Sequence, residues 1–156
     1  SRQALSRGSS TRAQAERYLR RILKHFDYAG VLAMEFFVIS GRLLANEMAP
    51  RVHNSGHWTI EGAVTSQFEN HLRAILGWPQ GDTTAVGHSA MLNFVGTIPD
   101  REQWLKEPNL HFHDYGKEAR PRRKVGHCTV VESTAARRDQ RLKRLLRLRQ
   151  GQISAG

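Results

Sequence analysis

The most constraining feature of the sequence is its longest apolar run, which spans Val31 to Ile39 and is interrupted only by Glu35. The run is rich in β-branched and aromatic residues, and a Gly-containing break at residues 40–42 separates it from a second extended run, Leu43 to Met48. Two such runs around a short break are typical of a β-hairpin. The run is too short, and too interrupted by charge, to cross a membrane as a helix.

A hairpin centred on Gly41 places Glu35 directly opposite Glu47. Directly opposed residues point to the same face of a sheet, about 4.5–5.5 Å apart at Cα. Two carboxylates at that distance repel each other unless one is protonated or a cation lies between them. Mg²⁺ prefers carboxylate oxygens together with waters and substrate phosphates, so the pair is a candidate magnesium site. Two exposed glutamates on a solvated face are the alternative.

A polar loop, residues 51–59, follows the second carboxylate and carries Arg51, His53 and Asn54. An arginine grips planar oxyanions at two points, an asparagine supplies neutral hydrogen bonds, and a histidine can move a proton near pH 7. A cation-bridged nucleotide beside such an anion pocket is the equipment for phosphoryl transfer.

The rest of the chain predicts a mixed α+β fold. We expect helices beginning at residues 10–11, 66, 100 and 133–134, and strands over residues 85–96, 110–115 and 125–131. The single cysteine, Cys128, excludes a disulfide framework, and we expect it to be a buried, inert thiol. His111 and His113 share one face of an expected strand and could begin a zinc site, but the sequence offers no evident third ligand.

The net charge of +10 is unevenly distributed. Residues 1–24 carry seven Lys or Arg against one acid, and residues 117–150 carry twelve against three, whereas the segment between them is acidic and holds seven of the eight histidines. This pattern argues against a protein that simply coats nucleic acid. It suits a site where acids hold a metal and bases hold phosphates. For the basic last helix, we favour leucines covering a small domain over binding to nucleic acid or membrane.

The hairpin and the loop together resemble a known family. The run Asn46-Glu-Met-Ala-Pro-Arg-Val-His-Asn-Ser-Gly-His-Trp-Thr59, preceded by Gly30-Val-Leu-Ala-Met-Glu-Phe-Phe37, is similar to 5-(carboxyamino)imidazole ribonucleotide synthase, an ATP-grasp enzyme of purine biosynthesis. The likeness continues through residues 66–71, 87–93, 115–117 and 123–127. The formate-dependent glycinamide ribonucleotide transformylase is the nearest competitor, because related ATP-grasp ligases share the two glutamates and vary the loop.

The resemblance implies that ATP phosphorylates bicarbonate to carboxyphosphate, whose carboxyl group passes to the amine of 5-aminoimidazole ribonucleotide. It implies that Glu35 and Glu47 hold Mg²⁺, or Mn²⁺, on the ATP phosphates, with Asn46 also at the nucleotide. It further implies a cytoplasmic homodimer.

Two other sets of residues acquire roles from the same resemblance. The first would bind bicarbonate or carboxyphosphate and comprises Arg51, His53 and Asn54. The second would bind the phosphate of the ribonucleotide and comprises Lys117, Arg123 and Lys124. Family members usually have glycine at the position of Arg122, so we expect the local backbone to differ there.

The fold that the resemblance implies is α+β: the C-terminal lobe of an ATP-grasp domain, with an antiparallel sheet and helices, plus a small β-rich C-terminal domain. Residues 1–16 would be a linker or a remnant of an upstream lobe, residues 17–79 the ATP-grasp half, residues 80–150 the small domain, and residues 151–156 a tail. Sixteen residues cannot supply the family's upstream lobe and its adenine pocket. We therefore expect a fragment, or a degenerate chain that works with a partner, and no ATP turnover by the isolated chain. A basic nucleic-acid-binding or interaction module is the non-enzymatic alternative.

Overall fold

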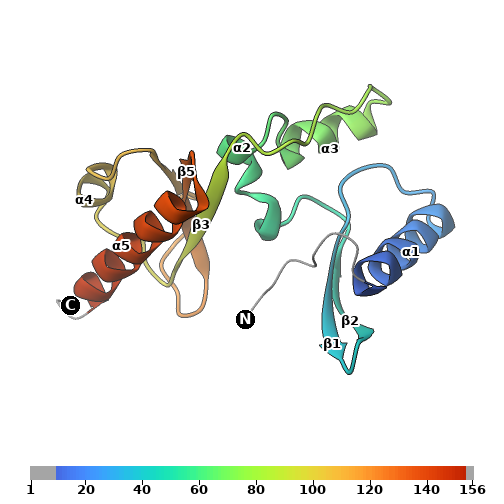
Figure 1. Cartoon of the computed structure of the whole chain (residues 1–156), viewed down its shortest axis with the longest axis horizontal. Coiled ribbons are helices and arrows are strands. Elements are labelled where there is room, and N and C mark those ends of the chain that lie inside the picture. Colours follow the sequence, from blue (N-terminus) through green and yellow to red (C-terminus); the bar gives the residue numbers. More distant parts are fainter. Residues whose placement is uncertain (1–9, 154–156) are drawn as a thin grey trace. The chain divides into compact units, whose positions relative to one another are not determined.

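The computed structural model describes residues 10–153 as a mixed α+β chain, as the sequence predicts (Figure 1). Residues 1–9 and 154–156, which belong to the expected linker and tail, lie outside the described residues. The elements in chain order are α1 (Ser10–His25), β1 (Ala33–Ile39), β2 (Arg42–Ala49), η1 (Asn54–Gly56), α2 (Thr59–Gly62), α3 (Gln67–Ile75), β3 (His88–Val95), α4 (Arg101–Leu105), β4 (Leu110–Asp114), β5 (Lys124–Glu132) and α5 (Ala135–Ile153).

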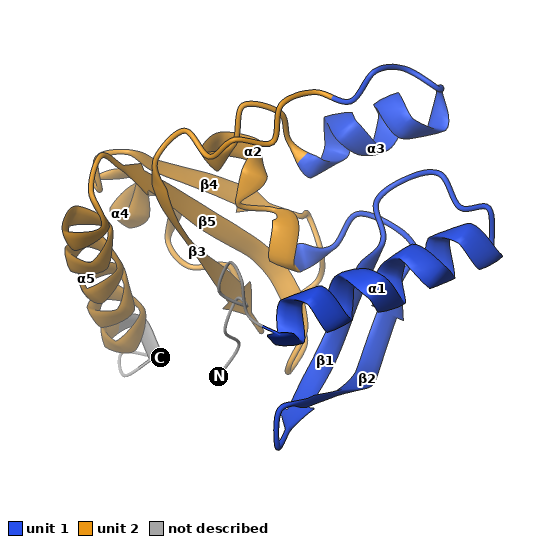
Figure 2. Ribbon diagram, turned by 45° about the vertical axis from the view of Figure 1, so that its right-hand side comes forward, with its two compact units in different colours: residues 1–54, 67–80 blue, residues 55–66, 81–156 orange. Residues whose placement is uncertain are grey.

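These elements form two units, and the chain passes between them at residues 54/55, 66/67 and 80/81 (Figure 2). Unit 1 comprises residues up to 54 together with residues 67–80, and unit 2 comprises residues 55–66 together with residues from 81 onward. The domain division that the resemblance implies, at residues 17–79 and 80–150, stays a prediction.

Unit 1 is built on the predicted hairpin of β1 and β2. Its turn consists of Ser40 and Gly41, whose φ angles of 48° and 77° are both positive. Turns of that kind match the right-handed twist of the two strands. Helix α1 packs against the hairpin: the Leu43 N–H donates to the Gln14 side chain (3.0 Å), and the Tyr18 and Phe36 ring centroids are 6.3 Å apart.

Unit 2 is built on an antiparallel sheet in the order β3-β5-β4. Helix α5 packs on β3 and β5, and α2 also packs on β5. The buried core consists of Phe94, Trp104, Leu110, Val125, Cys128, Val130 and Leu145. The expectation that Cys128 is buried is confirmed, and this burial raises the pKa of its thiol to about 12, which disfavours the reactive thiolate.

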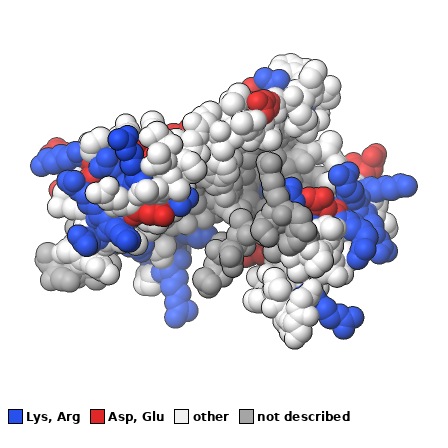
Figure 3. All heavy atoms as spheres, viewed as in Figure 1, with Lys and Arg blue, Asp and Glu red and all other residues white. Residues whose placement is uncertain are grey.

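The basic helix α5 is part of the packing of unit 2. Figure 3 shows Lys and Arg side chains gathered over α5 and also over α1. Glu107, whose side chain is 3% exposed, accepts from Arg141 (3.0 Å) and from Arg144 (2.6 Å). Arg141 also lies 3.3 Å from Glu132. Two of the cations on α5 therefore neutralise buried carboxylates, and Leu145 is buried beneath the helix as the sequence predicts.

Within residues 10–153, no helix has both the length and the apolar character needed to cross a membrane.

Candidate metal and anion-binding site

The hairpin places Glu35 opposite Glu47, as the sequence predicts, but by a different route. The turn has two residues, Ser40 and Gly41, so the register differs by one residue from that of the predicted hairpin centred on Gly41. If this register continued without interruption, Glu35 would pair with Asn46. A bulge between Glu35 and Phe36 shifts the register back and leaves Asn46 as an extra residue on β2. The predicted facing of the two glutamates is therefore confirmed, and the bulge is what produces it.

The extra residue of the bulge, Asn46, directly precedes Glu47. Successive residues of a regular strand point to opposite faces, whereas at a bulge two residues oppose one on the partner strand. Glu47 is paired with Glu35, and Asn46 is the unpaired residue directly before Glu47. Glu35 is half-buried, with a side chain 24% exposed, and Glu47 is exposed. The register therefore pairs the two glutamates, with Asn46 at the neighbouring unpaired position of β2.

The chemistry of this donor set fits a hard divalent cation that also binds phosphates. Carboxylate and amide oxygens are ligands that Mg²⁺ accepts, usually through one or two carboxylates with waters and phosphate oxygens completing the shell. No group of three or more His, Cys, Asp and Glu side chains in residues 10–153 is placed to hold a metal by itself. The pair of Glu35 and Glu47 therefore suits a nucleotide-bound ion better than a free-standing metal centre.

His53 lies next to this acidic pair. It is 7% exposed, and its Nε2 is 3.8 Å from Glu35 Oε1. The Gln67 side chain, at the start of α3, holds the backbone of His53 on both sides. The His53 N–H donates to Gln67 Oε1 (3.0 Å), and Gln67 Nε2 donates to the His53 carbonyl oxygen (2.8 Å). Gln67 thus fixes the loop that follows β2, a role that sequence reasoning missed.

The other two loop residues predicted to bind an anion flank His53. Arg51 is exposed and donates from Nη1 to the Val52 carbonyl oxygen (3.0 Å). Asn54 begins the short helix η1. The structure therefore brings His53 to Glu35, keeps Arg51 on the surface, and places Asn54 at the last position of unit 1 before the chain enters unit 2.

The three cations predicted to bind the ribonucleotide phosphate lie on one connection of unit 2, between β4 and β5. Lys117 and Arg123 are on the loop, and Lys124 is the first residue of β5. The loop is closed by the Tyr115 N–H, which donates to the Val125 carbonyl oxygen (3.0 Å). Arg122 has a φ of 62°, a left-handed conformation that glycine adopts at less cost.

A cluster of histidines under α2 was not predicted as a unit. His113 Nε2 lies 2.5 Å from Glu61 Oε1, and the His113 and His127 rings stack at 4.3 Å between centroids. Tyr115 OH is 2.8 Å from His127 Nδ1, and the His57 ring centroid lies 5.5 Å from that of His127. The alternation of His111 and His113 was the visible signal, but it gave no indication that Glu61 is the partner.

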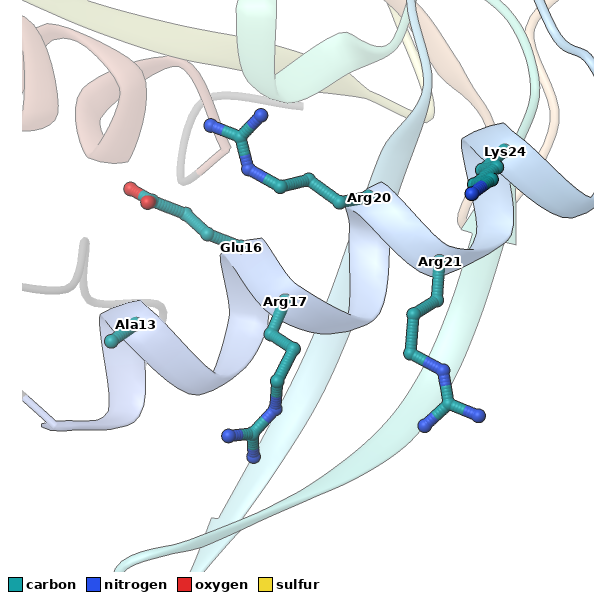
Figure 4. Close-up of a pocket in the computed structure, with 6 residues that line it drawn as sticks. All are labelled: Ala13, Glu16, Arg17, Arg20, Arg21 and Lys24. Atoms are coloured by element: carbon teal, nitrogen blue, oxygen red, sulfur yellow. The ribbon is translucent and has the colours of Figure 1, made fainter.

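Two hollows in unit 1 are lined by residues other than the predicted site residues. One, of about 380 Å³, is lined by Ala13, Glu16, Arg17, Arg20, Arg21 and Lys24. Figure 4 shows that all six side chains come from α1, with Arg17 and Arg21 directed to one side and Glu16 and Arg20 to the other. The second, of about 820 Å³, lies between α1 and the hairpin and includes Tyr18, Phe26 and Met34 in its lining. None of the residues predicted to act in catalysis lines either hollow.

Known protein families match both halves of this chain. A family model of the ATP-grasp domain matches residues 2–68, and a model of the phosphoribosylaminoimidazole carboxylase C-terminal domain matches residues 89–141. Over 125 residues the chain is 58% identical to the N5-carboxyaminoimidazole ribonucleotide synthase of Pseudomonas aeruginosa, covering 80% of this chain and 35% of that protein. The chain belongs to the N5-carboxyaminoimidazole ribonucleotide synthase family.

Solved structures of N5-carboxyaminoimidazole ribonucleotide synthases share its fold. The enzyme from Thermus thermophilus matches with a TM-score of 0.82 and 53% identity, over 92% of this chain and 40% of that chain. The enzyme from Aspergillus clavatus, in complex with ADP and 5-aminoimidazole ribonucleotide, matches with a TM-score of 0.76 and 36% identity, over 92% and 42%. The chain thus spans between 35% and 42% of the length of these three synthases.

The two family matches divide the predicted site residues between them. The bulged hairpin and the loop that carries Arg51, His53 and Asn54 lie inside the ATP-grasp match. Lys117, Arg123 and Lys124 lie inside the match to the C-terminal domain of the synthase. The predicted fold class, an ATP-grasp lobe with a small β-rich C-terminal domain, is confirmed.

Proposed function

We propose that this chain provides three parts of an enzyme that makes N5-carboxyaminoimidazole ribonucleotide. They are the acidic hairpin of β1 and β2, the anion loop of residues 51–54, and the phosphate-binding segment of residues 117–124. In this reaction bicarbonate attacks the γ-phosphorus of ATP, which gives carboxyphosphate and ADP. The amine of 5-aminoimidazole ribonucleotide then attacks the carboxyl carbon, and phosphate leaves. The family relationship supports this reaction over the formate-dependent alternative, because the relatives described above are named as N5-carboxyaminoimidazole ribonucleotide synthases.

The observation that carries the proposal is the bulged register, which pairs Glu35 with Glu47 and leaves Asn46 unpaired beside Glu47. In the proposed site the two glutamates hold Mg²⁺ or Mn²⁺ on the ATP phosphates, and Asn46 contacts the nucleotide. When bound there, a divalent ion would supply positive charge to the phosphate oxygens.

The anion loop receives bicarbonate and then carboxyphosphate through Arg51, His53 and Asn54. The clamp from Gln67 supports this role, because it holds the His53 backbone in a fixed position beside Glu35. Arg51 is exposed, and its guanidinium can exchange its hydrogen bond to the Val52 carbonyl oxygen for two parallel hydrogen bonds to a planar oxyanion. Lys117, Arg123 and Lys124 bind the dianionic phosphate of the ribonucleotide.

A chimaera tests the proposal. In the Pseudomonas aeruginosa synthase, the part that this chain matches is replaced by this chain, and ADP formation is followed. We expect ADP only when ATP, bicarbonate and 5-aminoimidazole ribonucleotide are all present. Changing Glu47→Gln should lower turnover by about 100-fold or more, because metal affinity depends steeply on its ligands and their partners.

Glu69→Gln is the matched control, since Glu69 is an exposed glutamate of unit 1 that pairs with Arg73 within α3. This variant should leave turnover unchanged. A chimaera that forms ADP equally well with Glu47→Gln, or that accepts formate and glycinamide ribonucleotide instead, contradicts the proposal.

The resemblance supports three further parts of the proposal. We infer that the intact enzyme is a homodimer, that it works in the cytoplasm, and that its domains divide near residues 79/80. Sedimentation equilibrium of the intact enzyme tests the first of these, with a mass of two chains expected and a mass of one chain against it.

A further inference from the structure

Unit 2 contains a row of side chains that leads from the exposed loop into the protein interior. Its members, in order, are Lys117, Tyr115, His127, His113 and Glu61. The Lys117 Nζ lies 5.1 Å from the centre of the Tyr115 ring, which is within the range of a cation–π contact. The hydroxyl of that ring is 2.8 Å from Nδ1 of His127, a residue that is 1% exposed. The Tyr115 ring is therefore held at its hydroxyl end by a buried side chain, while the lysine lies over its face.

His127 is in turn held from its other side. Its ring stacks on that of His113 with centroids 4.3 Å apart and planes 12° from parallel. The stack follows from the sheet, because β4 and β5 pair His113 directly with His127. His113 Nε2 lies 2.5 Å from an oxygen of Glu61, whose side chain is 9% exposed. The row thus runs from α2 across two strands to the loop that carries Lys117.

The side chain at the centre of the row, His127, is uncharged, which suits the Lys117 ammonium at its end. Burial lowers the pKa of His127 to about 4, and the nearby His113 and His57 rings add to the effect. His127 is therefore neutral at pH 7 and does not repel the Lys117 ammonium. Its Nε2 has no hydrogen-bond partner among the described residues, so the bond through Nδ1 to Tyr115 is the one that orients the ring toward the loop.

We propose that Tyr115, held by His127, is a positioning residue for Lys117 and sets where its ammonium group is presented to a phosphate. The proposal rests on the proposed function in one respect, namely that Lys117 receives the phosphate of the ribonucleotide. An exposed lysine loses rotamer freedom when it binds an anion, and a ring that already orders it reduces that loss. The remaining members of the row, His113 and Glu61, keep His127 in place.

The test uses the full 156-residue chain and inorganic phosphate as the probe. Tyr115→Phe keeps the aromatic face under Lys117 and removes only the hydroxyl that meets His127. In this variant we expect NMR relaxation to show increased motion at the amides of Gly116 and Lys117. We also expect phosphate affinity to fall by about threefold to tenfold, the size of one lost neutral hydrogen bond.

Tyr28→Phe is the matched control, because it also removes a hydroxyl hydrogen bond, from Tyr28 OH to the Val31 carbonyl oxygen (3.2 Å), but in unit 1. It should change neither the motion of Lys117 nor phosphate affinity. Wild-type relaxation at Gly116 and Lys117 in the Tyr115→Phe chain overturns the proposal, and so does an equal response in the Tyr28→Phe chain.

Lys117→Ala separates this inference from the proposed function. Phosphate affinity that survives Lys117→Ala unchanged contradicts the assignment of Lys117 to the ribonucleotide phosphate. The relaxation data from Tyr115→Phe decide independently whether Tyr115 orders the lysine.

Discussion

Replacing Gln67 by methionine should loosen the loop that carries His53. Methionine has nearly the same volume and flexibility, so the substitution removes the amide without creating a large cavity. It deletes the two hydrogen bonds, of 3.0 and 2.8 Å, that hold the His53 backbone. A buried backbone group left without a partner costs about 1–3 kcal/mol. Because Gln67 is itself only half-buried and water can enter, we expect a total loss of about 2 kcal/mol.

Hydrogen exchange at the His53 amide measures this effect locally. A loss of about 2 kcal/mol corresponds to an exchange rate roughly 30-fold faster, if the loop opens while the rest of unit 1 stays folded. Gln80→Met is the control, since Gln80 is exposed and lies in the same unit. If the His53 amide exchanges as slowly in the Gln67→Met chain as in the wild type, the clamp does not fix the loop and the reasoning is refuted.

Two further predictions concern unit 2. The pKa of His127 is lowered from 6.5 to about 4 in the folded chain. The contribution of neutral His127 to the stability of the fold is therefore fully present above pH 6.5 and is lost as the pH falls toward 4. The gap in unfolding free energy between wild type and His127→Asn should therefore shrink by about 2–3 kcal/mol from pH 7 to pH 4.5, and a constant gap contradicts this. Arg122→Gly should stabilise the chain to thermal unfolding by about 0.5–1 kcal/mol, because the residue has a φ of 62°. Arg120→Gly, at a position without positive φ, should lower stability instead, and the opposite ranking of the two variants contradicts the strain argument.

The β1–β2 hairpin was predicted from the sequence in part. The β-branched and aromatic apolar run and the Gly-containing break at residues 40–42 were enough to predict two paired strands and the facing of Glu35 and Glu47. The predicted register missed both the two-residue turn and the bulge, whose one-residue shifts cancel at the glutamates. The bulge at Asn46 has no glycine or other local signal, so its effect on Asn46 was visible only in the structure.

The contacts that support the site were beyond sequence reasoning for a different reason. Gln67 meets His53 across 14 residues, and Glu61 meets His113 across 52. Periodicity reports which face of its own element a side chain occupies, but not which distant element covers that face. Helix α2, which carries Glu61, has four residues, too few to show a helical repeat in the sequence.

The central claim is that the bulged hairpin makes Glu35 and Glu47 share one divalent ion. Mn²⁺ titrated together with ATP into the labelled chain tests it most directly, because a bound paramagnetic ion broadens the NMR signals of nearby amides. We expect the first signals to broaden to be those of Glu35, Asn46 and Glu47, and we expect this broadening to disappear in both Glu35→Gln and Glu47→Gln chains. Broadening that persists at the hairpin when either carboxylate is removed, or that begins elsewhere in the chain, contradicts the account.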